Sequence, residues 1–379
     1  MGYDYVVLGG GVYGCAAAWE LARRGARVLV LEARTVAAGA SGGLGKRGVR
    51  ACGRDPRELP LMRLAYDLWP ALAGAIGAAT GYERTGLLHL FEREPDGLDG
   101  GWASAPARAW AQQQRGIATE VLDRDAVRAR EPEVCDAVSG ALYCPDDGIA
   151  DHSATTRGLA AAAARLGAEI REGVAVSGLE RMGDRVTAVV TAEGEHLAVG
   201  EAALLLTNAH VPGFVREQIG VTLPVWSMLP QVLLTEPLDP PPVAHLIGHE
   251  RRTLALKPVP GGRVMISGGW HGRWDAQAGQ GAVIPAQVAG NLAEAVAVYP
   301  ALAGVRLAES DAGRPESVCV DGIPIIDRLP GAANLIVGTG WSGHGFAIAL
   351  AVAKLLAEWA TGAERPELLR PFAYDRFLA

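Results

Sequence analysis

The sequence predicts an α/β fold, α+β overall, in which a parallel-sheet domain is assembled from separated segments and an antiparallel-sheet domain is interleaved with it. Three observations predict this fold. The chain opens with a strand, a glycine-rich turn, a helix and a second strand, which is how a parallel sheet begins. Strand-like runs broken by Pro and Gly turns occur at Gln231–Thr235, Thr253–Leu256 and Arg263–Ser267, as in an antiparallel sheet. A last strand, Asn334–Val337, precedes an alanine-rich helix that ends near Trp359.

The first glycines have the spacing of a dinucleotide-binding turn. Gly9 permits the sharp turn out of the strand, Gly11 lets backbone amides approach a pyrophosphate, and Gly14 allows close packing of helix on strand. The helix that starts at Val12 turns its N-terminus toward the phosphates. Eighteen residues past Gly14, a hydrophobic run ends at Glu32, whose carboxylate can accept hydrogen bonds from both hydroxyls of an adenosine ribose. The motif predicts a Rossmann-like domain and leaves NAD and FAD both open.

The composition is that of a compact globular protein of two domains. The 379 residues are 49% hydrophobic and 20% charged, and the net charge of −7 without a basic stripe makes nucleic acid an unexpected partner. The five cysteines have no C-x-x-C spacing, so we expect no metal site. No uncharged apolar run reaches the length of a membrane span, and no secretory segment precedes the first strand. We therefore expect a cytoplasmic protein without a membrane span.

Local patterns predict most of the remaining elements and the domain limits. Helices are expected at Val12–Arg24, Leu59–Ile76 and Ser153–Leu166. Strands are expected at Arg27–Glu32, Thr85–Phe91, Glu169–Arg171, Val174–Val176, Arg185–Thr191, Ala203–Thr207, Gln231–Thr235, Thr253–Leu256 and Arg263–Ser267. We expect an irregular segment at Ala38–Gly53, and helices and loops in residues 93–140. The predicted dinucleotide-binding domain comprises 1–84, 146–222 and 312–379, and the second, substrate domain comprises 85–145 and 223–311.

Several segments, in order along nearly the whole chain, resemble those of a known family. Besides the first glycine turn they are Ala40–Gly43, Asp147–Gly148, Gly167–Glu169, Leu223–Val225, Asp321–Ile326 and Gly343–Phe346. The chain resembles the D-amino-acid-oxidase-like FAD-dependent oxidoreductases, which include glycine oxidase, sarcosine oxidase and related amine dehydrogenases. The last two segments are the most specific, because Rossmann enzymes that use only NAD have no such C-terminal return. The resemblance therefore implies a resident, non-covalent FAD.

The resemblance also implies which residues hold FAD. The pyrophosphate contacts would come from Gly9, Gly11, Val12 and Gly14, the ribose contact from Glu32 with Arg34 beside it, and further phosphate contacts from Ser41 and Gly43. Val176 resembles the family's backbone contact to adenine. Backbone amides at the start of the last helix would lie near the flavin ring, at Gly343, His344, Gly345 and Phe346. A positive helix end there stabilises negative charge on the reduced ring.

The implied reaction is oxidation of the C–N bond of a small amino acid or secondary amine acid, of the glycine, sarcosine, proline or D-amino-acid type. Hydride would pass to flavin N5, and water would hydrolyse the resulting imine. Arg50 resembles the carboxylate-binding arginine of monomeric sarcosine oxidase, and Arg314 resembles the arginine of an Arg-Pro pair in glycine oxidase. His271 falls near an active-site histidine of monomeric sarcosine oxidase. Structural ion pairs for the arginines and a structural hydrogen bond for His271 are the alternatives.

Two departures from sarcosine oxidase leave the electron acceptor open. Ser267 and Ala347 stand where that enzyme has lysines, one of which helps O2 to react. The chain has three lysines, and nothing in the sequence positions Lys46 or Lys257 in the site. An oxidase that uses O2 and a dehydrogenase that uses another electron acceptor both remain open.

The sequence also leaves open other reactions and a covalently attached flavin. A hydroxy-acid or polyol-phosphate dehydrogenase would need a base for the hydroxyl proton, and His271 is the candidate. A flavin-binding subunit of a hetero-oligomeric amine dehydrogenase is a further alternative, and a homo-oligomer is equally open. Cys319 is a candidate for covalent FAD and His152 for covalent FMN, against a buried thiol and a helix-start loop as the ordinary alternatives. The side chain and stereochemistry of the substrate are left open.

Overall fold

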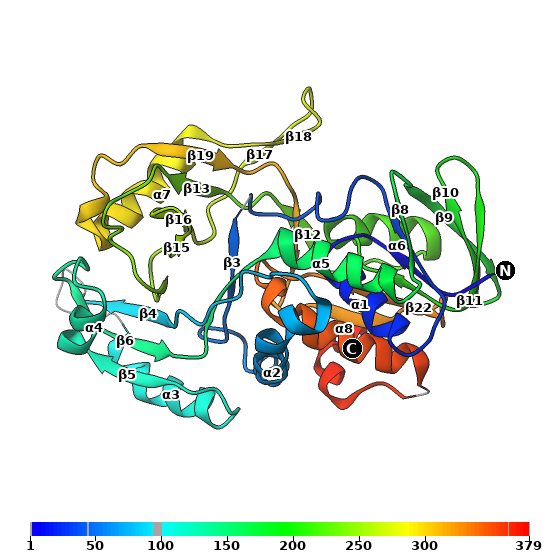
Figure 1. Ribbon diagram of the computed structural model, residues 1–379, viewed down its shortest axis with the longest axis horizontal. Coiled ribbons are helices and arrows are strands. Elements are labelled where there is room, and N and C mark those ends of the chain that lie inside the picture. Colours follow the sequence, from blue (N-terminus) through cyan, green and yellow to red (C-terminus); the bar gives the residue numbers. More distant parts are fainter. Residues whose placement is uncertain (1, 44, 94–100, 363, 379) are drawn as a thin grey trace.

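The computed structural model describes residues 2–43, 45–93, 101–362 and 364–378, which form two eight-stranded sheets flanked by helices. Figure 1 shows the two sheets toward opposite ends of the long axis, with strand β3 (Lys46–Val49) running between them. The predicted mixed α/β fold, with one largely parallel and one largely antiparallel sheet, is confirmed.

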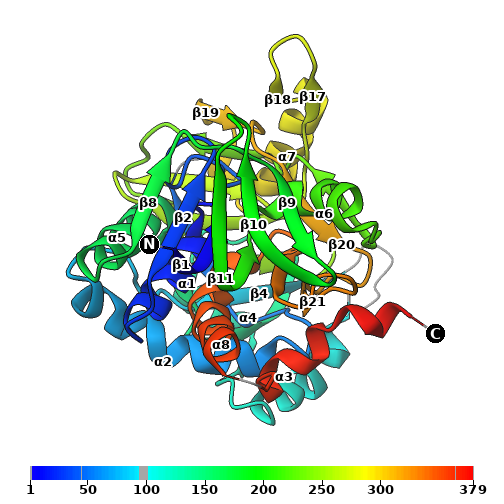
Figure 2. The ribbon, with the colours of Figure 1, turned by 90° about the vertical axis from the view of Figure 1, so that its right-hand side faces the viewer.

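The first sheet has a parallel centre. Its strands are β1 (Tyr3–Leu8), β2 (Val28–Glu32), β8 (Glu169–Glu172), β9 (Val176–Met182), β10 (Arg185–Thr191), β11 (His196–Leu205), β21 (Ile325–Arg328) and β22 (Leu335–Thr339). The main path runs β21-β22-β11-β1-β2-β8, and β21 alone is antiparallel to its neighbour on this path. The hairpin β9–β10 extends from β11. In Figure 2, β8, β2, β1 and β11 lie side by side across this sheet.

Helices cover both faces of this sheet, which is why the buried runs Tyr5–Leu8 of β1 and Val28–Leu31 of β2 are hydrophobic. On one face lie α1 (Val12–Ala22), α5 (His152–Arg165) and α8 (Ala349–Thr361), against which Val7 packs. On the other face, Val6 and Leu8 share a core with residues of α6 (Val211–Ile219). The helix α2 (Leu59–Ile76), whose bounds match the prediction, packs on α8.

The second sheet is antiparallel except for one parallel pair, β4 with β14. Its strands are β4 (Leu87–Glu92), β5 (Glu120–Asp123), β6 (Val138–Cys144), β13 (Val232–Thr235), β14 (Leu246–His249), β15 (Ala255–Val259), β16 (Arg263–Ser267) and β19 (Leu307–Asp311). They run in the order β19-β13-β16-β15-β14-β4-β6-β5. The flanking helices are α3 (Ala105–Gln113), α4 (Arg124–Arg130) and α7 (Pro285–Val298). One core joins this sheet to α7 through Val264, Ile266 and Ala295.

Three two-stranded pairs and several short 3-10 helices complete the described fold. The pairs are β3 with β7 (Gly148–Asp151), β12 (Val225–Met228) with β20 (Glu316–Cys319), and β17 (Arg273–Asp275) with β18 (Gln280–Ala282). The 3-10 helices are η1 (Trp102–Ser104), η2 (Asn208–His210), η3 (Pro300–Leu302), η4 (Gly345–Ile348), η5 (Glu367–Phe372) and η6 (Tyr374–Phe377).

Two expectations about local structure were wrong. The segment Ala38–Gly53 contains β3, and residues 93–140 contain β5 and the start of β6. Both misses have one cause, because these short strands depend on ladder partners elsewhere in the chain. β3 pairs with β7, about a hundred residues later, and β5 pairs with β6 across α4. Such partners cannot be predicted from a short run of neighbouring residues.

The strands of the two large sheets fall on opposite sides of the predicted domain limits. The first sheet uses strands from residues 1–84, 146–222 and 312–379, and the second uses strands from 85–145 and 223–311. The domain limits themselves stay a prediction. Within the described ranges, no helix combines the length and the apolar character that a membrane crossing requires.

Candidate active site

A cavity of about 960 Å³ extends between the two sheets. Its walls come from the first glycine turn, the end of β2, the start of β9 and the segment before η4, and on the other side from β4, β14 and β15. Segments far apart in the sequence thus meet around one space, which is of the size that bound cofactors occupy.

The first glycine turn forms one end of the cavity wall. Gly9 has a φ of 109°, which favours glycine, and a Cβ at Gly14 would lie 1.9 Å from the carbonyl oxygen of Gly9. A Cβ at Gly11 would meet nothing within 4 Å, so Gly11 leaves its open space to a ligand. Gly9, Gly11 and Val12 line the cavity at the N-terminus of α1, where backbone N–H groups favour phosphate.

Glu32 is held in place at the end of β2. Its Oε2 accepts a hydrogen bond from the backbone N–H of Gly10 at 2.7 Å, and its Oε1 accepts one from the N–H of Arg34 at 2.9 Å. A Cβ at Gly10 would lie 2.8 Å from Cβ of Glu32, so glycine is needed for this approach. Glu32, Arg34 and Val176 all line the cavity. The fixed carboxylate retains lone pairs for the hydroxyls of a ribose.

The last glycine segment lies against the first helix. Tyr13 on α1 donates a hydrogen bond to the carbonyl oxygen of Gly345 at 2.5 Å, and its ring stacks on Trp341 with 3.7 Å between centroids. A Cβ at Gly345 would lie 2.7 Å from Cβ of Trp341. The residues Gly343–Phe346 all line the cavity, as do Tyr13 and Trp341. Sequence reasoning missed Tyr13, because its partner is 332 residues away.

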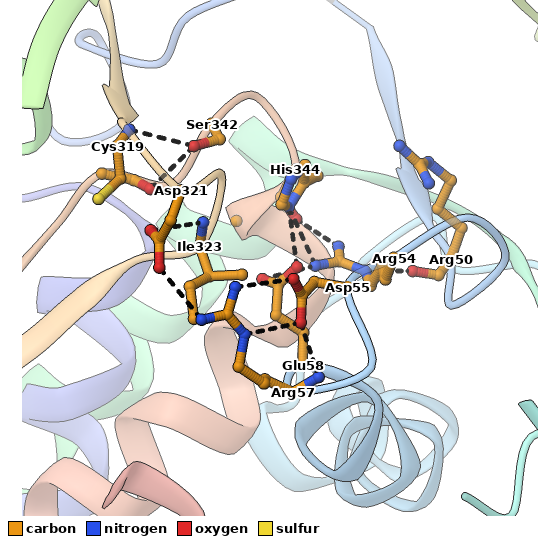
Figure 3. Close-up of polar contacts among 12 residues, drawn as sticks. Arg50, Arg54, Asp55, Arg57, Glu58, Cys319, Asp321, Ile323, Ser342 and His344 are labelled. Carbon is orange, nitrogen blue, oxygen red and sulfur yellow. Dashed lines mark hydrogen bonds and ion pairs between the residues drawn. The ribbon is translucent and has the colours of Figure 1, made fainter. Parts of the chain in front are cut away.

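A buried ion pair between Arg54 and Glu58 holds His344 in place. Arg54 donates to the carbonyl oxygen of His344 and contacts its Nδ1 at 3.2 Å, and it pairs with Glu58 at 3.2 Å (Figure 3). The side chains of Arg54 and Glu58 are each 1% exposed. Burial, aided by Arg54 and Arg50, holds the pKa of His344 well below its ordinary value, so the ring is neutral at physiological pH.

These features together fit FAD. The cavity is long enough to bring a fixed carboxylate at Glu32 and the amide-rich segment Gly343–Phe346 onto one continuous wall. Gly11 has no side chain on this wall, so a phosphate can come close to the backbone amides there.

Two residues expected at the phosphates have other contacts. Ser41 lines the cavity, but its hydroxyl donates to Glu316, whose pKa is raised by burial. Gly43 is not among the lining residues, and a Cβ there would lie 2.7 Å from Cγ2 of Val232 on β13. The space that glycine leaves at position 43 is thus taken by the second sheet.

The buried carboxylate of Asp147 fixes the turn that follows Arg50. The N–H groups of Ala51 and Cys52 donate to Asp147 at 2.6 and 3.2 Å, so the chain turns directly after β3. The Arg50 guanidinium lines the cavity and donates from Nη1 to the carbonyl oxygen of Cys52 at 2.7 Å. It makes no ion pair with an acidic side chain of the described residues. Figure 3 shows it directed away from the Arg54 cluster. Burial, then Arg54, lowers its pKa, yet an arginine remains charged.

The other two predicted substrate residues lie outside the cavity lining. His271 is exposed and forms an isolated bridge with Pro230 through the backbone. Arg314 donates from Nε to the carbonyl oxygen of Ala38 at 2.9 Å, and its neighbour Pro315 faces the cavity in its place. The structure therefore brings Arg50 alone of the three to the cavity.

Lys257 is a cavity residue that we did not expect. Sequence patterns did not position a lysine in the site, whereas in the structure β15 directs Lys257 into the cavity, near Arg47 and Arg50. It is 7% exposed and has no hydrogen-bond or ion-pair partner in the described chain. Burial and the two arginines lower its pKa to about 7. The alternation of β15 was the available signal, since Leu256 beside it belongs to the sheet core. Lys46 instead pairs with Glu83.

The two residues considered for covalent attachment are both buried. His152 begins α5, lines the cavity and contacts the edge of Phe346, with ring centroids 6.3 Å apart. Its pKa is lowered to about 4, first by burial. Cys319 lies on β20 outside the cavity lining, and burial raises the pKa of its thiol to about 11. Covalent flavin at either residue stays a prediction.

Comparison with known proteins agrees with this geometry. The family model described as FAD dependent oxidoreductase matches residues 4–359. The β subunit of sarcosine oxidase from Rhizobium meliloti (strain 1021) is 29% identical over 388 residues, covering 99% of this chain and 88% of the relative. Glycine oxidase from Geobacillus kaustophilus (strain HTA426) is 27% identical over 389 residues, covering 99% and 97%.

Solved structures are similar over the full chain. L-proline dehydrogenase from P. horikoshii has a TM-score of 0.87 at 23% identity, with 99% of this chain and 98% of that chain covered. Glycine oxidase from Geobacillus kaustophilus has a TM-score of 0.85 at 24% identity, with 100% and 99% covered. At these identities the likeness establishes the fold. The family match covers most of the chain, and the cavity fits the cofactor, so this protein belongs to the family of FAD-dependent oxidoreductases.

Proposed function

We propose that this enzyme oxidises the C–N bond of a small amino acid or secondary amine acid to an imine, with bound FAD as the hydride acceptor. The observation that carries the proposal is Arg50, a half-buried guanidinium on the cavity wall that has no acidic partner among the described residues. The relatives described as sarcosine, glycine and 4-methylaminobutanoate oxidases support this class of reaction.

In the proposed mechanism, Arg50 binds the carboxylate of the substrate. A planar guanidinium binds a carboxylate through two parallel hydrogen bonds, and these strengthen where water is excluded. Since Nη1 is already held by the carbonyl oxygen of Cys52, the arginine is oriented before the substrate arrives. Such preorganisation fixes the α-carbon of the substrate relative to the cavity wall.

A hydroxy-acid dehydrogenase is less compatible with the site. Oxidation of an alcohol requires a base for the hydroxyl proton, and His271, the candidate for that role, has an exposed side chain outside the cavity lining. The amine reaction needs only that the nitrogen lose its extra proton.

For the partner subunit and the electron acceptor we propose only the general class. Because two relatives are described as β subunits of sarcosine oxidase, we propose a hetero-oligomer as the second candidate, with this chain as its flavin-binding subunit. The reduced enzyme then passes electrons to O2 or to another acceptor. We place the reaction in the cytoplasm.

Anaerobic mixing of the yellow holoenzyme with single compounds tests the proposal. The panel comprises glycine, sarcosine, proline, D-amino acids and hydroxy acids, and loss of flavin absorbance reports the reaction. We expect bleaching by at least one amine acid and by no hydroxy acid. Bleaching by hydroxy acids alone would overturn the proposal. Bleaching by none of the compounds would favour the alternative of a flavin-binding subunit that has no amine site of its own. The speed of recolouring in air separates oxidase from dehydrogenase.

A further inference from the structure

A histidine on β4 faces the same cavity as Arg50. On β4, Leu88 and Leu90 point into the core of the second sheet, whereas Leu87 and His89 line the cavity. The side chain of His89 is 15% exposed, and its ring meets the edge of Phe91 with centroids 5.7 Å apart.

The tautomer of His89 follows from its partner Glu250. Nε2 of His89 lies 2.9 Å from Oε2 of Glu250, and Arg108 on α3 binds both oxygens of this carboxylate at 2.5 Å. The hydrogen bond from His89, together with Arg108, lowers the pKa of Glu250 to about 2, so the carboxylate is ionised and only accepts. Nε2 must therefore carry a proton, and in the neutral ring Nδ1 presents a lone pair.

Two glycines leave open space in front of this lone pair. A Cβ at Gly248, the neighbour of His89 on β14, would lie 3.0 Å from Nδ1, and both Gly248 and Gly53 line the cavity. Nδ1 has no hydrogen-bond partner in the described part of the chain. A Cβ at Gly53 would lie 3.9 Å from Nδ1 of His89 and also 3.9 Å from Nη1 of Arg50. An acceptor nitrogen and a carboxylate-binding guanidinium thus flank one small volume.

We propose that His89 binds the amino group of the substrate through Nδ1 and takes its extra proton, while Arg50 holds the carboxylate. This inference rests on the proposed amine oxidation and names the base for it. The N–H bond of the ammonium breaks, Nδ1–H forms, and the nitrogen keeps the electron pair. The nitrogen then supports departure of hydride from the α-carbon as the C–N double bond forms. The imidazolium is paired with the carboxylate of Glu250.

The charges around His89 become more favourable to proton uptake when substrate is bound. In the free enzyme the pKa of His89 is lowered overall, first by burial and also by Arg50 and His249, although Glu250 raises it. Arg108 pairs with Glu250. A substrate carboxylate on Arg50 neutralises one of the cations that oppose the imidazolium, so the carboxylate makes His89 more basic.

Lys257 is the rival base in the cavity. It has no carboxylate partner, and Arg47 and Arg50 both oppose its protonation. A protonated His89 is stabilised by Glu250, whereas a protonated Lys257 has no such partner. The position of Nδ1, which faces the same space beside Gly53 as the guanidinium of Arg50, therefore favours His89.

A matched pair of unreactive ligands tests the contact without turnover. 2-Methylalanine has no α-hydrogen, and 2,2-dimethylpropanoate replaces its amine by a methyl group. Titration of the holoenzyme, followed by flavin absorbance, gives both affinities. For His89→Gln we expect about a tenfold loss for 2-methylalanine and no change for 2,2-dimethylpropanoate. Equal losses for both ligands would overturn the contact. The control is His196→Gln, a surface histidine that also lies 2.9 Å from a glutamate.

Anaerobic bleaching by the best amine substrate tests the proton transfer. We expect His89→Ala to bleach about 100-fold more slowly at pH 7, to regain speed at alkaline pH where the amine loses its proton unaided, and to be rescued by added imidazole. Wild type should lose its rate at acid pH, because a protonated His89 accepts nothing. A variant with the wild-type rate and pH profile would overturn the inference and leave the amine oxidation standing. If wild type itself is bleached by no amine acid, the proposed function fails instead. A pH profile that moves only in Lys257→Met would assign the base to Lys257 and overturn the inference.

Discussion

Arg54 binds the backbone carbonyl oxygen of His344, which lies 290 residues further along the chain (Figure 3). The same guanidinium pairs with the buried carboxylate of Glu58. This contact joins the loop after β3, which presents Arg50, to the glycine segment before η4. Arg50, which we propose to bind the substrate, and the C-terminal part of the cavity wall are therefore linked through the contacts of Arg54.

We expect removal of Arg54 to destabilise the enzyme. Arg54→Met leaves Glu58 buried without its cation and frees the carbonyl oxygen of His344, and we expect a loss of about 3 kcal/mol in unfolding free energy. The double variant Arg54→Met/Glu58→Met should recover part of this loss. Urea unfolding with saturating FAD measures both. A single variant as stable as wild type would contradict the account of the pair as a structural anchor.

The sequence predicts the elements of this fold much better than the contacts between them. The helix at Leu59–Ile76 and the first glycine turn depend on neighbouring residues, and both have the predicted form. The prediction of an FAD-dependent family is also confirmed. It could be made from the sequence because each motif that supports it consists of neighbouring residues. Tyr13 and Arg54 act through partners about 300 residues away, which no local pattern records.

Substrate residues are the hardest to predict from sequence. Whether an arginine faces a cavity depends on the loop that carries it. Arg50 precedes a turn that Asp147 fixes through the N–H groups of Ala51 and Cys52, whereas Arg314 binds the carbonyl oxygen of Ala38. His89 was not a candidate at all. One histidine in a strand gives no signal until Glu250 and Gly248 are seen beside it.

Two glycines of the first turn should respond differently to alanine. A Cβ at Gly11 meets open space, so Gly11→Ala should fold normally and bind FAD at least tenfold more weakly, because the methyl group occupies the approach to the phosphates. A Cβ at Gly14 would lie 1.9 Å from the oxygen of Gly9, so Gly14→Ala should misfold or lose several kcal/mol of stability. Circular dichroism separates folding from FAD content. A Gly11→Ala enzyme with full FAD affinity would contradict the assignment.

Arg50 and Arg314 form a natural test and control for carboxylate binding. Arg50→Ala removes a charged anchor from the cavity, and we expect KM for the amine acid to rise about 100-fold while FAD stays bound. Arg314→Ala removes a hydrogen bond to Ala38 outside the cavity lining, and KM should change less than threefold. Steady-state kinetics on both variants decide. Similar KM values for Arg50→Ala and wild type would remove Arg50 from the substrate site.

Lys257 should make the stability of the enzyme depend on pH. Its pKa falls from an ordinary value of 10.5 to about 7 in the fold, mainly through burial. At pH values between 7 and 10.5, Lys257 is protonated in the unfolded chain and largely deprotonated in the folded chain. The lysine therefore lowers the free energy of unfolding at pH 7, and this destabilisation becomes smaller as the pH rises. Methionine has a similar length and no charge.

We therefore expect Lys257→Met to stabilise the protein by about 4 kcal/mol at pH 7 and by about 1 kcal/mol at pH 9.5. Any gain from packing of methionine is the same at both values, so the difference of about 3 kcal/mol isolates the titration. Urea unfolding of the holoenzyme at the two pH values gives the result. Lys354→Met is the control, since Lys354 is partly exposed beside Glu358 on α8 and should change stability by less than about 1 kcal/mol at either pH. A gain from Lys257→Met that does not vary with pH would mean that Lys257 keeps its ordinary titration in the fold.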